Sequence, residues 1–141
     1  MKWCIQRNKQ WCVAVACAVL LAFTVLGLRN RINPLRVEKI VVYGQELTDE
    51  EMRRFLWLYN TSRLSTKHPG CEPCTVDDRI YIYYADGSYL SIVDHGSHDW
   101  EFQTDYCDRE GKYTDRKRVY VANERLDEFV QALVEKYGLC Q

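Results

Sequence analysis

The hydrophobic pattern of the chain begins with one long apolar run. Residues 11–28, WCVAVACAVLLAFTVLGL, are 18 residues without a charge. A helix of that length spans about 27 Å, close to the hydrocarbon thickness of a bilayer. Because the run is apolar on every face and has basic residues on both sides, the pattern favours a single membrane-spanning helix over a buried core helix.

Two kinds of cleaved leader fit this run less well. A signal peptide has a shorter apolar region that ends at a small-x-small site, whereas this run ends at Leu28 followed by Arg29. A lipoprotein signal would close its apolar region at Cys17, but the uncharged run continues beyond it. We therefore expect an uncleaved signal-anchor, with residues 1–10 as a basic tail and residues 29–36 as a juxtamembrane linker.

The remaining segment, residues 37–141, combines strand-like and helical patterns. Residues 37–43 are rich in β-branched side chains and predict a strand that ends at Gly44. Thr48 and Glu51 have the spacing of a capping box and predict the start of a helix. One face of that helix is apolar at helical spacing and consists of Met52, Phe55, Leu56 and Tyr59.

Residues 80–122 have the pattern of consecutive hairpins. Two alternating runs flank Asp86-Gly87, a pair typical of two-residue type I′ turns. We expect further turns at residues 95–98 and 108–112, each followed by another strand. Residues 61–78 lack a periodic pattern and are expected to form an irregular loop.

A second helix is expected near the C-terminal end. Asn123 suits an N-cap, Gly138 suits a C-cap, and the apolar residues between them recur at helical spacing. The element order is therefore β-α-β-β-β-β-α. This order predicts an α+β domain at residues 37–141, with an antiparallel sheet and two helices packed on one face.

Charge separates the two parts of the chain. Residues 1–33 hold five basic and no acidic residues, and residues 34–141 hold 14 basic and 20 acidic residues, a net charge of −6. An acidic domain argues against nucleic-acid binding, and basic residues beside an apolar run favour a membrane. The basic residues flanking the run are nearly balanced, so orientation rests on four domain cysteines, which favour an oxidising, extracytoplasmic compartment. A cytoplasmic domain with reduced cysteines is the alternative.

The four domain cysteines are Cys71, Cys74, Cys107 and Cys140. The segment GCEPC resembles a thioredoxin-type redox motif, but that motif needs a following helix to lower the thiol pKa. Here a strand pattern follows, and the neighbouring acidic residues would raise the pKa. A structural disulfide is therefore favoured. Four cysteines allow three connectivities, of which we prefer Cys71–Cys74 with Cys107–Cys140.

Zinc binding is an alternative use of the same region. The spacing of the histidines and cysteines is compatible with zinc ligands; the candidates are His68, Cys71, Cys74, His95 and His98. The two groups fall on different loops, and their spacing alone is weak evidence. The segment VDHGSHD contains catalytic-triad residue types, but sequence proximity does not make a triad. We expect no enzyme activity and no cofactor.

Aromatic residues are abundant, with ten tyrosines and four tryptophans. Tyrosine is enriched at binding surfaces because its ring buries a large area while its hydroxyl stays polar. If the helices cover one face of the sheet, tyrosines can line the other; the candidates are Tyr81, Tyr83, Tyr89, Tyr113 and Tyr120. An ordinary sheet exterior is the alternative interpretation.

The segments VEKIVVYG, DDRIYIYYADGSYLSI and RVYVANERLDEFVQALVEK together resemble small membrane-anchored or secreted ectodomains of Gram-positive gut bacteria. The resemblance implies a fold and a location, but no catalytic residues. With the anchor and the tyrosines, it favours a single-pass cell-membrane protein whose ectodomain binds a protein or a cell-envelope ligand. The alternative is a thiol–disulfide or zinc-binding protein that uses Cys71 and Cys74.

Overall fold

The computed structural model describes residues 11, 13–21, 31–67, 80–97, 100–114 and 118–139. The chain divides into two compact units, Met1–Arg31 and Ile32–Gln141. In the first unit, residues 13–21 are helical. Within the described ranges, no helix has both the length and the apolar character needed to cross a bilayer. Residues 22–28 of the expected anchor lie outside those ranges.

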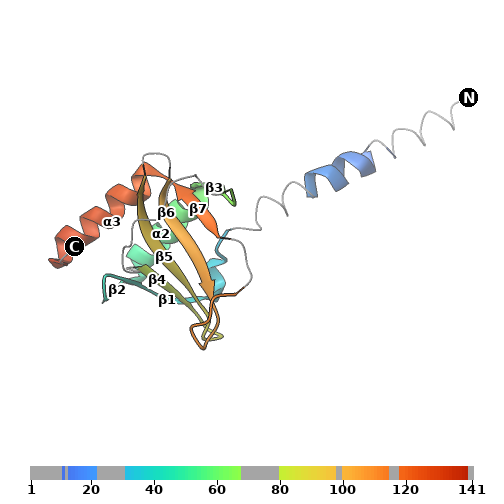
Figure 1. Cartoon of the computed structure of the whole chain (residues 1–141). Helices are drawn as coiled ribbons and strands as arrows, with labels where there is room; N and C mark the ends of the chain where they lie inside the picture. The colour runs from blue at the N-terminus through green and yellow to red at the C-terminus, as the bar shows by residue number, and fades with distance from the viewer. Residues whose placement is uncertain are drawn as a thin grey trace, which may run out of the picture. The chain divides into compact units, whose positions relative to one another are not determined.

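The second unit is an α+β domain, as its sequence predicts (Figure 1). In the described part of the chain, seven strands form one antiparallel sheet in the order β2-β1-β4-β5-β6-β7-β3. The strands are β1 (Val37–Val42), β2 (Gln45–Glu46), β3 (Arg63–Ser65), β4 (Ile80–Tyr84), β5 (Tyr89–Ser97), β6 (Trp100–Cys107) and β7 (Val119–Ala122). The short 3-10 helix η1 (Pro34–Arg36) precedes β1, and the α-helices are α2 (Asp49–Thr61) and α3 (Glu124–Tyr137).

Both α-helices begin at the caps expected from the sequence. Thr48 caps α2, and its hydroxyl and backbone N–H form a reciprocal capping box with Glu51. The Asn123 side chain accepts a hydrogen bond from the backbone of Arg125 at the start of α3. The same Asn123 amide donates to the carbonyl of Leu58 at 2.9 Å, so the start of α3 is tied to the end of α2.

The core lies between the two helices and one face of the sheet. The inward strand residues are opposite one another in register; they include Ile40, Ile82, Leu90, Ile92, Phe102 and Val121. Phe55 and Tyr59 from α2 and Leu126 and Val130 from α3 complete the same buried cluster. The Tyr59 hydroxyl lies 3.0 Å from the Thr104 hydroxyl, which satisfies two polar groups inside the core.

Two strands depart from the sequence expectation. Tyr43 and Gly44 both have positive φ, 50° and 83°, and form a two-residue turn that brings β2 against β1. Residues 63–65, expected to be part of an irregular loop, form β3 and pair with β7 at the edge of the sheet. With two and three residues, these strands are too short to show an alternating pattern.

The turn at Asp86-Gly87 is also different from the expected two-residue type I′ turn. Tyr84 N–H donates to the Ser88 carbonyl, and Gly87 N–H donates to the Tyr84 carbonyl, both at 2.9 Å. The loop therefore contains three residues, 85–87, with Gly87 at φ 84°. A type I turn followed by a left-handed glycine is the usual geometry of three-residue hairpins.

Residues 95–97, expected to be part of a turn, belong to β5. β5 continues through His95 to Ser97, which pairs with Trp100, and the register shifts between Asp94 and Ser97. An irregularity of this kind lets a strand extend past a glycine such as Gly96. The turn at residues 108–112 is confirmed, because Asp108 N–H donates to the Lys112 carbonyl.

Candidate functional site

The face of the sheet opposite the helices carries a cluster of three tyrosines. Tyr83 lies directly opposite Tyr89, and Tyr81 lies opposite Ser91. The ring centroids of Tyr83 and Tyr89 are 5.6 Å apart, and those of Tyr81 lie 6.2 Å from Tyr83 and 6.0 Å from Tyr89. All three side chains are partly exposed. We call Tyr81, Tyr83 and Tyr89 the tyrosine cluster.

Two further residues extend the tyrosine cluster. The Lys39 ammonium lies 5.3 Å from the centre of the Tyr83 ring, within cation–π distance. Tyr113 forms a β-bridge with Cys107, which lies opposite Tyr89, and its side chain is 60% exposed. Four of the five tyrosines expected at a binding surface therefore lie in one neighbourhood.

Tyr120 is the exception among the five tyrosines. Its register position opposite Gln103 puts it on the same face of the sheet, but its side chain is only 2% exposed. It therefore cannot offer an exposed ring to a partner. The alternating pattern predicts correctly on which face Tyr120 lies but not that this end of the face is covered.

The hydroxyl of Tyr89 is held in its neutral form. Burial raises the pKa of Tyr89, and the hydrogen bond to the Cys107 thiol raises it further, to about 12. Two ion pairs lie near the cluster: Arg118 Nε is 2.9 Å from Asp105, and Lys39 Nζ is 3.9 Å from Glu46. The tyrosine cluster thus presents three aromatic rings, with the Tyr89 hydroxyl in its neutral form.

Buried polar groups lie beside the cluster on the same face. Gln103 donates from its side-chain amide to Asp105 at 2.8 Å, and Asp105 lies opposite Ser91. Ser91 Oγ and Gln103 Oε1 are buried with no hydrogen-bond partner among the described residues. Because their atoms are inaccessible, these groups are not themselves contact points for a partner.

The expected disulfides and zinc ligands fall mostly outside the described residues. This applies to Cys71, Cys74, Cys140, His68 and His98. Within the described ranges there is no disulfide, and Cys107 is a buried thiol. Nor do those ranges contain a group of three His, Cys, Asp or Glu residues that could hold a metal ion. His95 lies in β5 and is described by its backbone alone.

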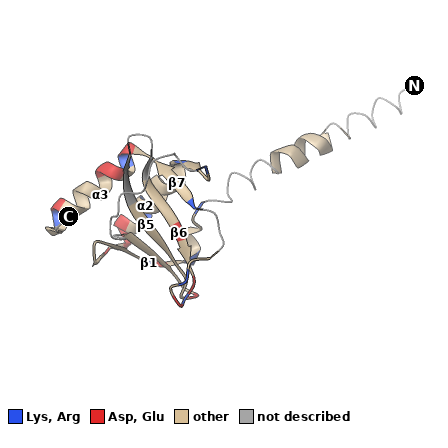
Figure 2. Cartoon of the chain, viewed as in Figure 1, with Lys and Arg blue, Asp and Glu red and all other residues tan. Residues whose placement is uncertain are grey.

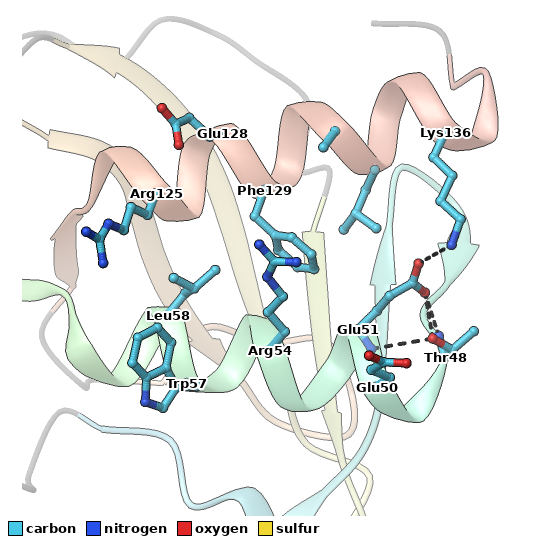
Figure 3. Close-up of a pocket in the computed structure, with 12 residues that line it drawn as sticks. Thr48, Glu50, Glu51, Arg54, Trp57, Leu58, Arg125, Glu128, Phe129 and Lys136 are labelled. Carbon is cyan, nitrogen blue, oxygen red and sulfur yellow. Dashed lines mark hydrogen bonds and ion pairs between the residues drawn. The ribbon is translucent and has the colours of Figure 1, made fainter.

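A groove between α2 and α3 is a second candidate surface (Figure 3). The helices run alongside each other in front of the sheet, and the groove between them has a volume of about 660 Å³. The Arg54 guanidinium lies 4.9 Å from the centre of the Phe129 ring on its floor. Trp57, on the rim, is 59% exposed. Trp57 lies off the apolar face of α2. This is the sequence feature that could have indicated a surface at this groove.

One end of the groove is closed by an interhelical contact. Glu51 accepts from Lys136 Nζ at 2.7 Å and from the Tyr137 hydroxyl at 3.0 Å. Burial raises the pKa of Glu51, but the hydrogen bonds from Lys136, Thr48 and Tyr137 outweigh it and lower that pKa to about 2. The contact joins the start of α2 to the end of α3 and so has a structural role.

The two surfaces differ in charge as well as shape. Figure 2 shows acidic and basic residues along α3 and at the turns, while the strands are largely uncharged. The groove accordingly has charged walls, including Glu50, Glu128 and Arg125. The tyrosine cluster consists of uncharged rings, with Lys39 over one of them. Comparisons of the chain with protein-family models, with curated proteins and with solved structures found no match.

Proposed function

We propose that this chain is a membrane-anchored binding module whose α+β domain recognises another protein through the tyrosine cluster and Tyr113. The observation that carries the proposal is the contact among the rings of Tyr81, Tyr83 and Tyr89 on the face opposite the helices. Tyr113 adds a ring that is 60% exposed at the margin of that cluster.

The rings of the tyrosine cluster are preorganised for binding, which is the physical support for the proposal. Rings that already pack against each other lose little conformational freedom when a partner covers them, so more of the contact energy appears as affinity. Tyrosine rings with polar tips are the side chains that most often dominate protein interfaces. Because the contact surface consists of aromatic rings, the chemistry favours a partly apolar partner surface.

Membrane anchoring is the second part of the proposal. Its support is the uncharged run at residues 11–28 and the basic residues that flank it. The domain would then lie on the extracytoplasmic side, in the compartment that the four domain cysteines favour. In that compartment Cys71 and Cys74 would form a disulfide.

Site-specific photo-crosslinking on the full chain in its native membrane tests the binding surface. A photoreactive residue in place of Tyr113 should form a protein adduct of defined mass. The same residue in place of Glu128, which lines the helix groove, is the matched control and should not. An adduct from Glu128 alone would assign binding to the groove. An adduct from Tyr113 with a non-protein envelope component would overturn the partner class.

A further inference from the structure

The three rings of the tyrosine cluster are tilted against one another rather than stacked. The centroids of Tyr81, Tyr83 and Tyr89 form a triangle with sides of 5.6, 6.0 and 6.2 Å, and the ring planes meet at 35°, 39° and 68°. Elsewhere in the sheet, Tyr84 and Tyr106 stack at 7°, so each covers a face of the other. Tilted rings cover one another less, and all three rings of the cluster are partly exposed.

The faces of these three rings are negative, because an aromatic ring has a quadrupole with its negative side on the face. An organic cation is attracted to such a face when it lies within about 6 Å of the centroid. Since the centroids are themselves only about 6 Å apart, one cation above the triangle lies within that range of all three rings. The cluster can therefore direct three cation–π contacts to a single charge.

The chain itself supplies a cation to this cluster. The Lys39 ammonium lies 5.3 Å from the centroid of Tyr83, its register partner across β1 and β4. The Lys39 side chain is 43% exposed, and its ion pair with Glu46 is long, at 3.9 Å. Lys39 thus shows that the cluster accepts an ammonium group, which here approaches from the β1 side.

The charge of the domain favours the same class of ligand. Residues 34–141 carry a net charge of −6, and the strands between the charged turns are largely uncharged (Figure 2). A negative domain raises the local concentration of cations and disfavours the approach of an acidic partner surface. Because the pKa of Tyr89 is raised to about 12, attraction of a cation at neutral pH depends on the ring faces and not on a phenolate.

We propose that the tyrosine cluster recognises a lysine or arginine side chain of the partner protein, with the charged end of that side chain over the three rings. The inference rests on the proposed function, because it names the chemistry by which that surface binds its partner. The apolar stem of such a side chain packs against the rings while its charge faces them. Lys39 is then an internal competitor, because its ammonium repels the incoming cation and shares the ring of Tyr83.

Two peptides that differ only in charge test this chemistry. The probes are a blocked tripeptide of glycine, arginine and glycine and the same peptide with citrulline, the uncharged isostere of arginine, titrated into the full chain in uncharged maltoside micelles. Fluorine NMR of 3-fluorotyrosine, with resonances assigned by substitution, reports which rings respond. We expect the arginine peptide to shift the resonances of Tyr81, Tyr83 and Tyr89 with a Kd at least about three-fold lower than that of the citrulline peptide. Equal Kd values, or a response confined to other tyrosines, would overturn the inference.

A substitution at Lys39 tests the competition. Lys39→Met removes the ammonium and keeps an apolar stem, so it should lower the Kd of the arginine peptide by about two-fold or more. The matched control is Lys67→Met, which removes an exposed lysine that follows β3, at the far end of the sheet from β1, and should change that Kd less. A higher Kd in Lys39→Met would contradict the inference, because Lys39 would then support binding instead of competing with it.

The Tyr113 photo-adduct in the native membrane tests the proposed function separately. A protein adduct at Tyr113 together with equal binding of the arginine and citrulline peptides would leave the binding surface standing and refute its cation chemistry. Preference for the arginine peptide without any protein adduct at Tyr113 would refute the proposed function and, with it, the partner protein as the source of the cation.

Discussion

At the scale of single residues, Glu51 shows how one carboxylate joins two helices. Its side chain is 12% exposed and accepts from Thr48, Lys136 and Tyr137. Its pKa is lowered from 4.5 to about 2 in the folded state. A carboxylate with a lowered pKa stabilises the folded state fully above its unfolded value, and this contribution is lost as the pH falls through the folded value.

The pH dependence of unfolding should therefore report on Glu51. We expect Glu51→Gln to lower the free energy of unfolding by about 1 kcal/mol at neutral pH, where exposure of the Lys136 partner screens the pair. The difference from the unmodified protein should shrink as the pH is lowered from about 5 to about 2. Urea unfolding across this range measures it, with the exposed neighbour Glu50→Gln as control. A pH-independent difference would refute the assignment.

Tyr120 and Tyr113 provide a second test at this scale. Both are tyrosines that the sequence assigns to the same face, but they are 2% and 60% exposed. Tyr120→Ser should destabilise the domain by about 3 kcal/mol because it removes a buried ring, and Tyr113→Ser by less than about 0.5 kcal/mol. Thermal unfolding of the two variants measures the contrast. Equal losses of unfolding free energy in the two variants would show that the burial assigned to Tyr120 is incorrect.

The sequence pattern alone does not distinguish the exposed Tyr113 from the buried Tyr120. Alternation indicates the face to which a side chain points, and it does so correctly for Tyr81, Tyr83 and the buried Ile82 between them. It carries no information on what lies over that face. The burial of Tyr120 and the contact between Tyr89 and Cys107 depend on residues distant in sequence, so neither could be predicted.

At the scale of the elements, the three-residue hairpin between β4 and β5 depends on Gly87. Its φ of 84° lies in the left-handed region, and a Cβ there would lie 3.4 Å from Arg109 Cβ, an ordinary contact. Strain in the backbone is thus the main cost of a side chain. We expect Gly87→Ala to lower the free energy of unfolding by about 1–2 kcal/mol.

The matched control for this turn is Gly87→Asn. Asparagine tolerates the left-handed region better than alanine, so it should be the less destabilising of the two substitutions. Chemical denaturation of both variants distinguishes strain from steric contact. If asparagine, the larger side chain, cost more than alanine, contact with Arg109 would be the cause, and the backbone explanation would be wrong.

Element boundaries were predictable where a side chain bonds to the nearby backbone. The Thr48 and Asn123 caps and the Gly138 C-cap, with φ 61°, all act within a few residues of their own position. The strands β2 and β3 were not predictable, because each is defined by pairing with another strand and is too short for a periodic signal. Asp86-Gly87 indicated a turn but not its length.

At the scale of the whole domain, the sequence predicts the layers but not the full order of the strands. The strands β4, β5, β6 and β7 are neighbours in sequence order, as expected for consecutive strands joined without a crossover. The pairing of β1 with β4 and of β3 with β7 joins segments distant along the chain. The groove between α2 and α3 is likewise a product of tertiary packing.

The arrangement separates the domain into surfaces with different chemistry. Charged residues line the groove on the helix side, and neutral aromatic rings lie on the sheet side. We assign partner binding to the sheet side.

The measurement that tests the binding assignment most directly is the yield of the Tyr113 photo-adduct in a Tyr83→Ser variant of the full chain. Tyr83 lies near both other rings of the tyrosine cluster and is not a member of the buried core cluster. If the cluster binds the partner, the yield should decrease by about ten-fold or more while the unfolding temperature changes by only a few degrees. An unchanged yield with an intact fold would contradict the assignment of binding to this face.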